Sequence, residues 1–130
     1  MPESREIVTN TGPLLALVAA TGDLHILDDL YERVVVPQEV AQEMTVDNAS
    51  RFGAAEFESA SWLIRKDTPA AAAPSLANTL GPGEAAVIHW ALAEHAGTVC
   101  IDESIGRRVA RLNGLRVTGS LGILMRAKRE

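Results

Sequence analysis

The sequence predicts an α/β fold, a three-layer α/β/α sandwich around a central, mainly parallel sheet. Short apolar runs recur along the 130 residues, and segments with a helical spacing of apolar residues separate them. The run Val34-Val35-Val36 is continuously β-branched, as expected of a strand buried on both faces. Strands that alternate with helices form parallel sheets covered on both sides. No internal repeat or linker divides the chain, so we expect one domain over residues 1–130.

In the first half of the chain, apolar spacing and turn residues predict three strands and four helices. Proline is tolerated at the first position of a helix, and Asp or Asn can cap the first turn by accepting hydrogen bonds from its N–H groups. The expected strands are 7–9, 34–36 and 62–64. Two of the expected helices follow a proline: one at 14–20, with Pro13 at its first position, and one at 38–44, after Pro37. Asp23 is expected to cap a helix that carries Leu24, Leu27 and Leu30 on one face, and Asp47 or Asn48 to cap a helix at 49–59.

The second half begins with a stretch of weak pattern, residues 67–80, which holds two prolines and four consecutive alanines. We predict a loop there with one turn of helix. Gly81-Pro82-Gly83 ends it, and the alternation then resumes. The expected elements are a helix at 84–95, a strand at 98–101, a helix at 104–113, a strand at 115–118 and a helix at 121–128.

Composition excludes several classes of protein. Apolar residues make up 47% and charged residues 22%, as in ordinary globular proteins, and no apolar run reaches the roughly 18 residues of a membrane span. The first residues lack the basic-then-apolar order of a secretory signal. The single cysteine, Cys100, excludes an internal disulfide, and its place in a predicted strand indicates a buried residue rather than a nucleophile. We therefore expect a cytoplasmic protein.

The charge of the chain changes sign near residue 104. The net charge is −5, which by itself argues against a nucleic-acid partner, but residues 104–130 carry seven basic side chains and one acidic. This basic set fits a solvated helix surface or a contact with an acidic partner, and it also fits a rim that faces phosphate groups. In the second case Arg107 and Arg108 are the candidates for substrate binding. The set comprises Arg107, Arg108, Arg111, Arg116, Arg126, Lys128 and Arg129.

Polar side chains follow three of the predicted strands directly. Asn10 follows the first strand, Asp102-Glu103 follows the strand that contains Cys100, and Thr118-Gly119-Ser120 follows the last. The carboxyl ends of parallel strands face one crevice, so these residues are expected to meet in space. Each also has a local explanation, because Asp, Ser and Thr commonly cap the helix that comes next.

Three glutamates are expected near the same edge. Glu39 and Glu43 lie one turn apart on the helix after the second strand, and Glu84 opens the helix after Gly83. Glu84 in a first helical turn is also favoured by the helix dipole alone. Carboxylates that converge need a counter-charge, and oxygen ligands of this kind suit Mg²⁺ or Mn²⁺. The three histidines are not spaced as zinc ligands, and no glycine-rich phosphate loop follows any strand, which argues against a nucleotide-binding domain.

Together these segments resemble the PIN-domain family, and most closely a prokaryotic branch of small stand-alone, toxin-type nucleases. The resemblance covers roughly Ile7 to Arg129. It implies metal-dependent cleavage of RNA with Mg²⁺ or Mn²⁺, and many such proteins are homodimeric toxins that a small antitoxin protein silences. The segments that carry it are IVTNTGPLLAL, VVVPQEVAQEM, LGPGEAAVIHWAL, CIDESIGRRVA and GLRVTGSLGILMRAKR.

The resemblance also implies roles for individual residues. Glu43, Glu84 and Asp102 take the positions of catalytic, metal-binding carboxylates; Glu103 is the alternative to Asp102, which we favour. Thr118 and Ser120 would lie at the rim of the site. Asn10 takes the position of the family's first aspartate, and its amide oxygen can still face a metal without adding charge. An amide there leaves two hypotheses open: a working metal-dependent endoribonuclease, or a PIN-like module that binds RNA or a partner with weak or no catalysis.

Overall fold

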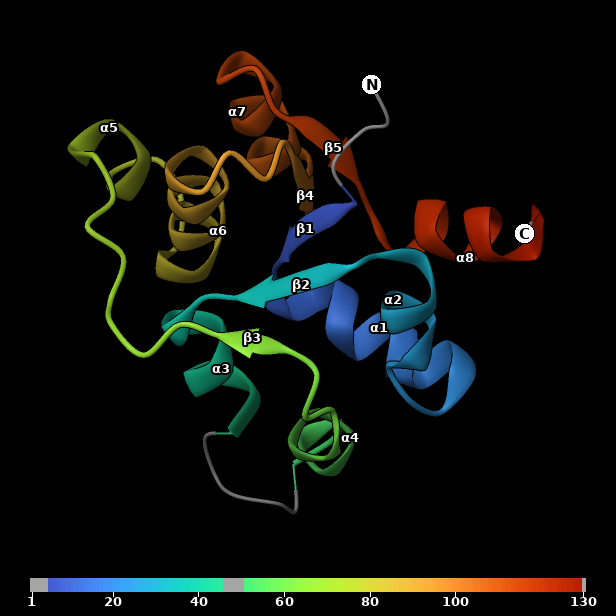
Figure 1. Cartoon of the computed structure of the whole chain (residues 1–130). Helices are drawn as coiled ribbons and strands as arrows, with labels where there is room; N and C mark the ends of the chain where they lie inside the picture. Colours follow the sequence, from blue (N-terminus) through green and yellow to red (C-terminus); the bar gives the residue numbers. More distant parts are fainter. Residues whose placement is uncertain (1–4, 46–50, 130) are drawn as a thin grey trace.

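The computed structural model describes residues 5–45 and 51–129, and its core is a five-stranded sheet (Figure 1). The strands are β1 (Glu6–Thr9), β2 (Arg33–Val36), β3 (Ile64–Arg65), β4 (Thr98–Cys100) and β5 (Arg116–Thr118), in the order β3-β2-β1-β4-β5. All four pairings are parallel; in the register, Val8 lies opposite Val35 on one side and Val99 on the other. The predicted α/β/α sandwich with a parallel sheet is therefore confirmed.

Helices cover both faces of this sheet, as Figure 1 shows. Helices α6 and α7 pack on one face against β1, β4 and β5, while α1, α2 and α8 pack on the other, and α3 bridges α1 and α6. The bounds are α1 (Thr11–Thr21), α2 (His25–Leu30), α3 (Gln38–Thr45), α4 (Ala54–Ser59), α5 (Pro74–Ala77), α6 (Pro82–Ala93), α7 (Ser104–Leu112) and α8 (Ser120–Arg129).

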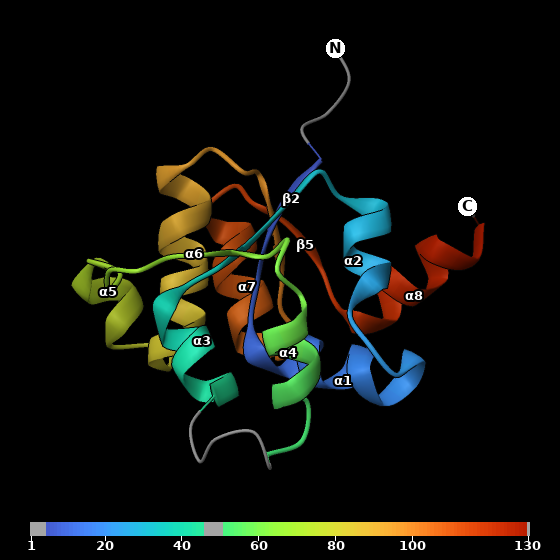
Figure 2. The same ribbon diagram turned by 60° about the horizontal axis from the view of Figure 1, so that its bottom comes forward.

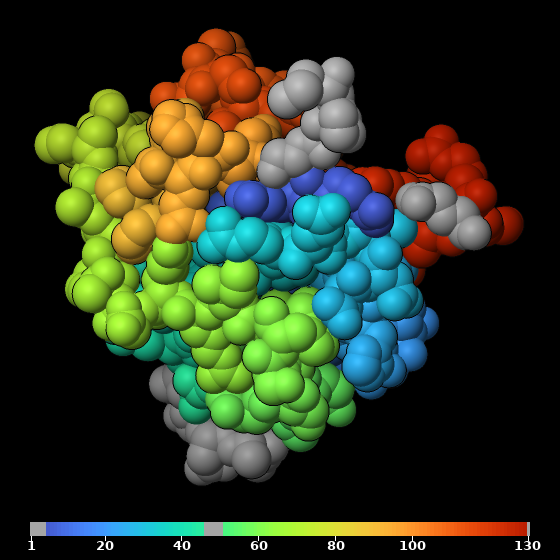
Figure 3. All heavy atoms as spheres, in the orientation of Figure 1, coloured from blue at the N-terminus to red at the C-terminus, as the bar shows by residue number. Residues whose placement is uncertain are grey.

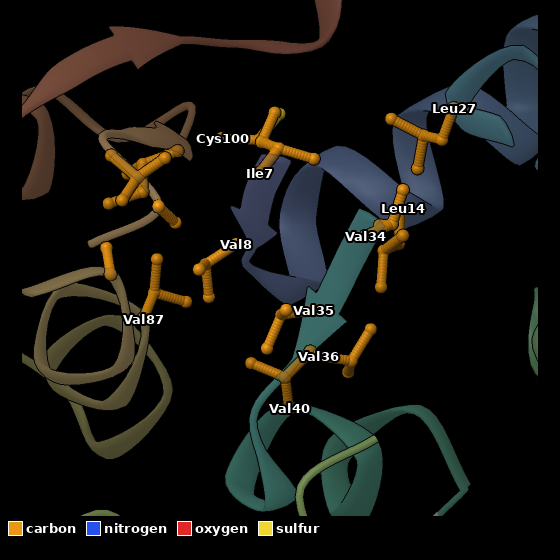
Figure 4. Packing of buried hydrophobic residues seen from close by; sticks show 14 of the residues in the cluster. Ile7, Val8, Leu14, Leu27, Val34, Val35, Val36, Val40, Val87 and Cys100 are labelled. Atoms are coloured by element: carbon orange, nitrogen blue, oxygen red, sulfur yellow. The ribbon is translucent and has the colours of Figure 1, made fainter. Parts of the chain in front are cut away.

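The hydrophobic core lies between the sheet and these two helical layers. In Figure 4, Val8 of β1 points toward Val87 of α6, whereas Val34 of β2 lies beside Leu14 of α1. All four side chains are at least 98% buried. Burial on both faces explains the unbroken apolar runs of the central strands, because every residue after the first in β1, β2 and β4 is buried.

Cys100 is completely buried at the end of β4, which confirms the expectation of a buried strand cysteine. Burial raises the pKa of its thiol to about 12, since a thiolate would lose its hydration there. The thiol is therefore neutral and cannot serve as a nucleophile at physiological pH.

Two predicted elements were placed wrongly and a third begins earlier than expected. The helix expected at 49–59 begins only at Ala54, because Gly53 has a φ of 82° and the chain turns there; Asp47 and Asn48 lie outside the described residues. The strand expected at 62–64 is Ile64–Arg65, since Leu63 N–H donates to Ala60 O in a turn. Helix α1 begins at Thr11, so that Pro13 is its third residue rather than its first.

Asp23 is not the N-cap of α2 as predicted, because Leu24 occupies that position; Asp23 instead accepts a hydrogen bond of 3.0 Å from the N–H of His25, the first residue of the helix. The loop with one helical turn expected at 67–80 is confirmed, since α5 is a single turn within it.

The C-terminal helix α8 stands out from the body of the molecule (Figure 3). Its Ile123 is buried, but Leu121 and Met125 are 69% and 56% exposed. The apolar side chains near the chain's C-terminus are thus divided between core and surface. Across the described residues, no helix has both the length and the apolar character needed to span a membrane.

The parallel strands bring the starts of several helices to one edge. Figure 2 shows β1 running into α1 at the lower end of the molecule, where α3 and α4 also lie. Helix α6 contacts both α3 and β1. Residues at the carboxyl ends of β1 and β4 therefore face the first turns of α1 and α6.

Candidate metal centre

A cavity of about 760 Å³ opens at this carboxyl edge of the sheet. Its walls come from the first turns of α1 and α6, from one face of α3, from the residue that follows β4 and from the turn before α4. The lining residues are Asn10, Thr11, Gly12, Leu15, Glu39, Gln42, Glu43, Arg51, Gly81, Pro82, Gly83, Glu84 and Glu103. Four of the residues that the sequence selected, Asn10, Glu43, Glu84 and Glu103, therefore share one cavity.

Asn10 joins β1 to α1 and is held by its backbone. Its N–H donates to Cys100 O at 3.0 Å, which extends the pairing of β1 with β4 by one residue. Asn10 is the N-cap of α1 by position, with φ −89° and ψ 171°, yet its side chain makes no capping hydrogen bond. The amide is thus available to the cavity rather than committed to the helix.

Glu43 reaches the cavity from α3, where Val40 and Met44 anchor the helix in the core. A Cβ atom added to Gly83 would stand 2.6 Å from Glu43 Oε1 and 3.2 Å from Asn10 Oδ1. Both oxygens therefore converge on the first turn of α6, and a side chain at position 83 would have to displace the Glu43 carboxylate.

Glu84 is the third residue of α6, and its Oε2 is buried without a hydrogen-bond partner. This oxygen lies 2.5 Å from where a Cβ on Gly106 would stand, so the absence of a side chain at position 106 leaves it room beside α7. Burial raises the pKa of the Glu84 carboxyl, and the negative charges of Glu103 and, to a smaller extent, Glu43 raise it further.

The acidic pair after β4 is divided between two environments. Glu103 lines the cavity beside Glu84. Asp102 does not line it; instead, its Oδ1 accepts from Ser120 N–H at 2.8 Å and its Oδ2 from Ser120 Oγ–H at 2.9 Å. Asp102 thus holds the first turn of α8, whereas Glu103, the alternative that the sequence left open, lines the cavity.

The other four predicted residues, Thr118, Ser120, Arg107 and Arg108, are not among the residues that line the cavity. The N–H and the hydroxyl of Ser120 both donate to Asp102, and the Thr118 hydroxyl donates to Gly119 O at 3.4 Å. Arg107 donates to Ile101 O at 2.8 Å, which fixes its guanidinium beneath the end of β4. Arg108 is exposed on α7.

Sequence reasoning did not select Arg51, Gln42 or Thr11 for the cavity. Arg51 lies in an irregular turn that carries no recognisable pattern, so no signal pointed to it. A signal for Thr11 was present in the sequence, because it is the polar residue directly after Asn10. Glu39 also lines the cavity, and its Oε2 accepts a hydrogen bond of 2.8 Å from Ala70 N–H, which ties that segment to α3.

The carboxylate and amide oxygens that line the cavity are suitable ligands for a hard divalent cation. Carboxylate and amide oxygens are the ligands that Mg²⁺ and Mn²⁺ prefer. A charged oxygen buried without a partner, as at Glu84 Oε2, is unfavourable unless a cation or proton neutralises it. Within residues 5–45 and 51–129, no three acidic, histidine or cysteine side chains already form a ligand cluster, so binding would require these side chains to rotate toward one another.

The chain matches a family model described as a PIN domain over residues 6–130. It has no significant match among curated proteins. PIN domains are generally nucleases, typically use divalent metals and interact with nucleic acids. Because the match spans nearly the whole sequence, and the fold is the parallel α/β sandwich expected from it, the chain belongs to the PIN-domain family.

Proposed function

We propose that the protein is a metal-dependent endoribonuclease that uses Mg²⁺ or Mn²⁺ and acts as the toxin of a toxin–antitoxin pair. The observation that carries the nuclease proposal is the cavity shared by Asn10, Glu43, Glu84 and Glu103, with Glu84 Oε2 buried and unpartnered. The proposed toxin role rests on the resemblance to the toxin-type branch.

In this proposal Glu43, Glu84 and Glu103 hold the metal ion, and Asn10 contributes its amide oxygen. A bound divalent ion would supply a water of lowered pKa and neutralise charge that develops on the phosphate. The protein's own contribution is to orient these oxygens from four segments of the chain: the β1–α1 junction, α3, α6 and the β4–α7 junction. Gly83 and Gly106 keep the backbone of α6 and α7 close enough for that.

In the same proposal, the basic side chains of α7 bind the phosphate backbone of the RNA. Arg108 and Arg111 are exposed on α7, which starts one residue after Glu103. Phosphate contacts of this kind supply affinity without sequence preference. The exposed Leu121 and Met125 of α8 support the homodimer or antitoxin contact, since exposed apolar side chains that cluster on one helix mark protein interfaces.

Incubation of the protein with RNA and Mn²⁺ tests the nuclease activity directly. We expect cleavage by the wild type and a loss of roughly 100-fold or more in the Glu43→Gln variant, because an amide cannot replace a charged metal ligand. Glu32→Gln is the matched control, since Glu32 is exposed before β2 at the opposite end of the sheet. Equal cleavage by all three proteins, or none by any, would exclude the proposed activity.

The neutral side chain of Asn10 supports a second candidate function, a PIN-like module that binds RNA or a partner with weak or no catalysis. One negative charge at ~4 Å from a cation is worth roughly 4 kcal/mol at an effective dielectric of about 20, before desolvation is subtracted. If the site is already competent, Asn10→Asp should tighten Mn²⁺ binding but change cleavage little. A variant that gains both metal binding and cleavage from an inactive wild type would favour the binding module. Calorimetry and an RNA-cleavage assay distinguish the two.

A further inference from the structure

We propose that the N-terminus of α1 is a phosphate-binding site, in which Thr11 and Gly12 receive a phosphate group of the RNA beside the metal centre. The inference rests on the proposed RNA-cleaving function, because it names what holds the substrate at that site. Its chemistry is that of a helix N-terminus that presents backbone N–H groups and a hydroxyl to an anion.

The first turn of α1 keeps its hydrogen-bond donors free. The first N–H groups of a helix have no acceptor within the helix and depend on a capping side chain. Asn10 stands at the N-cap position but makes no side-chain capping bond, and Pro13 has no N–H to satisfy. The N–H groups of Thr11 and Gly12 are left as the donors of this turn.

The Thr11 hydroxyl is a second and independent sign of a ligand. Thr11 is only 9% exposed and lines the cavity, yet its Oγ1 has no hydrogen-bond partner. A buried hydroxyl without a partner costs free energy, and such groups are uncommon in folded proteins. A phosphate oxygen at the mouth of this helix would accept from the hydroxyl and from the neighbouring N–H groups together.

Space and charge at this point also suit an anion. Gly12 is exposed, and no atom lies within 4 Å of where its Cβ would stand, so the front of the helix is open. Asn10 is neutral at the N-cap, where an aspartate would both cap the helix and repel phosphate. Arg51 lines the same cavity and adds a positive charge opposite the glutamates. The amide at position 10 thus lowers the negative charge where the phosphate would bind.

Titration with inorganic phosphate, followed by the NMR signals of the backbone amides, tests this site. It is carried out first in EDTA and then with saturating Mg²⁺, at constant ionic strength. We expect the Thr11 and Gly12 amide signals to move with phosphate in at least one of the two conditions. If neither amide responds in either condition, the site does not exist.

Thr11→Val and Thr21→Val form a matched pair for the same titration, since Thr21 lies at the other end of α1 and its hydroxyl is satisfied by Leu17 O and Asp23 O. We expect Thr11→Val to weaken phosphate binding roughly ten-fold, as for one hydrogen bond to a charged group, while Thr21→Val leaves it unchanged. Because Thr11→Val removes an unpartnered hydroxyl and keeps the side-chain shape, its Tm should not fall.

Equal phosphate affinity in wild type and Thr11→Val would overturn the inference even if RNA is cleaved. A phosphate response at Thr11 that persists in a protein without cleavage would support this inference and reject the nuclease proposal alone.

Discussion

Replacement of Glu84 by glutamine is expected to abolish metal binding and RNA cleavage and, at the same time, to stabilise the metal-free protein at neutral pH. Burial and the negative charge of Glu103 raise the pKa of this carboxyl in the folded state. A carboxyl with a raised folded pKa destabilises the protein at pH values above that pKa, and this penalty disappears as the pH falls below the usual glutamate value. Glutamine carries no charge, so it removes the penalty at every pH.

The prediction also specifies how the difference in Tm between the wild type and Glu84→Gln changes with pH. In EDTA, the Tm of the wild type should rise relative to that of Glu84→Gln as the pH is lowered from neutral toward 4.5, the ordinary pKa of a glutamate. Cleavage in Mn²⁺ should fall by roughly 100-fold or more in the variant. Glu32→Gln again serves as the control. A lower Tm in EDTA together with intact cleavage would show that Glu84 stabilises the fold and does not hold a metal.

Substitution of Asp102 is expected to lower the stability of the fold, whereas substitution of Glu103 is expected to weaken metal binding. Asp102→Ala removes the acceptor for the Ser120 N–H and hydroxyl groups at the start of α8, a loss of about 1–2 kcal/mol in the free energy of unfolding by analogy with other helix caps. Glu103→Gln removes a cavity carboxylate and should weaken Mn²⁺ binding roughly 10-fold to 100-fold with little effect on stability.

Urea unfolding and Mn²⁺ calorimetry on both variants separate these effects. Asp102→Asn complements the pair, because it keeps one acceptor for Ser120 while it removes the charge. If Asp102→Asn loses Mn²⁺ affinity and Glu103→Gln keeps it, then Asp102 is the ligand that the family resemblance favoured, and Glu103 is a solvated residue of the rim.

The sequence was sufficient for the sheet because burial leaves a strong pattern. Val34-Val35-Val36 could only be a strand covered on both faces, and the alternation of such strands with helices determines that their carboxyl ends meet. The convergence of Asn10, Glu43 and Glu84 followed from that topology. Details that depend on one backbone angle did not follow, such as the start of α4 at the left-handed Gly53.

The choice between Asp102 and Glu103 could not be made from the sequence for a related reason. The two residues are adjacent after a strand, where successive side chains point in opposite directions. In the structure Asp102 faces the start of α8, where it accepts two hydrogen bonds from Ser120, and Glu103 lines the cavity. The contact between Asp102 and Ser120 joins residues 18 positions apart, so no local sequence pattern indicates it.

The central claim is that the cavity at the carboxyl edge of the sheet binds a divalent cation. Calorimetric titration of Mn²⁺ into the wild type and into Glu43→Gln tests it most directly, because it needs no knowledge of the RNA target. We expect saturable binding to the wild type at or below millimolar Mn²⁺ and a large loss of affinity in Glu43→Gln. No binding to the wild type at millimolar Mn²⁺, or equal binding to both proteins, would contradict the claim.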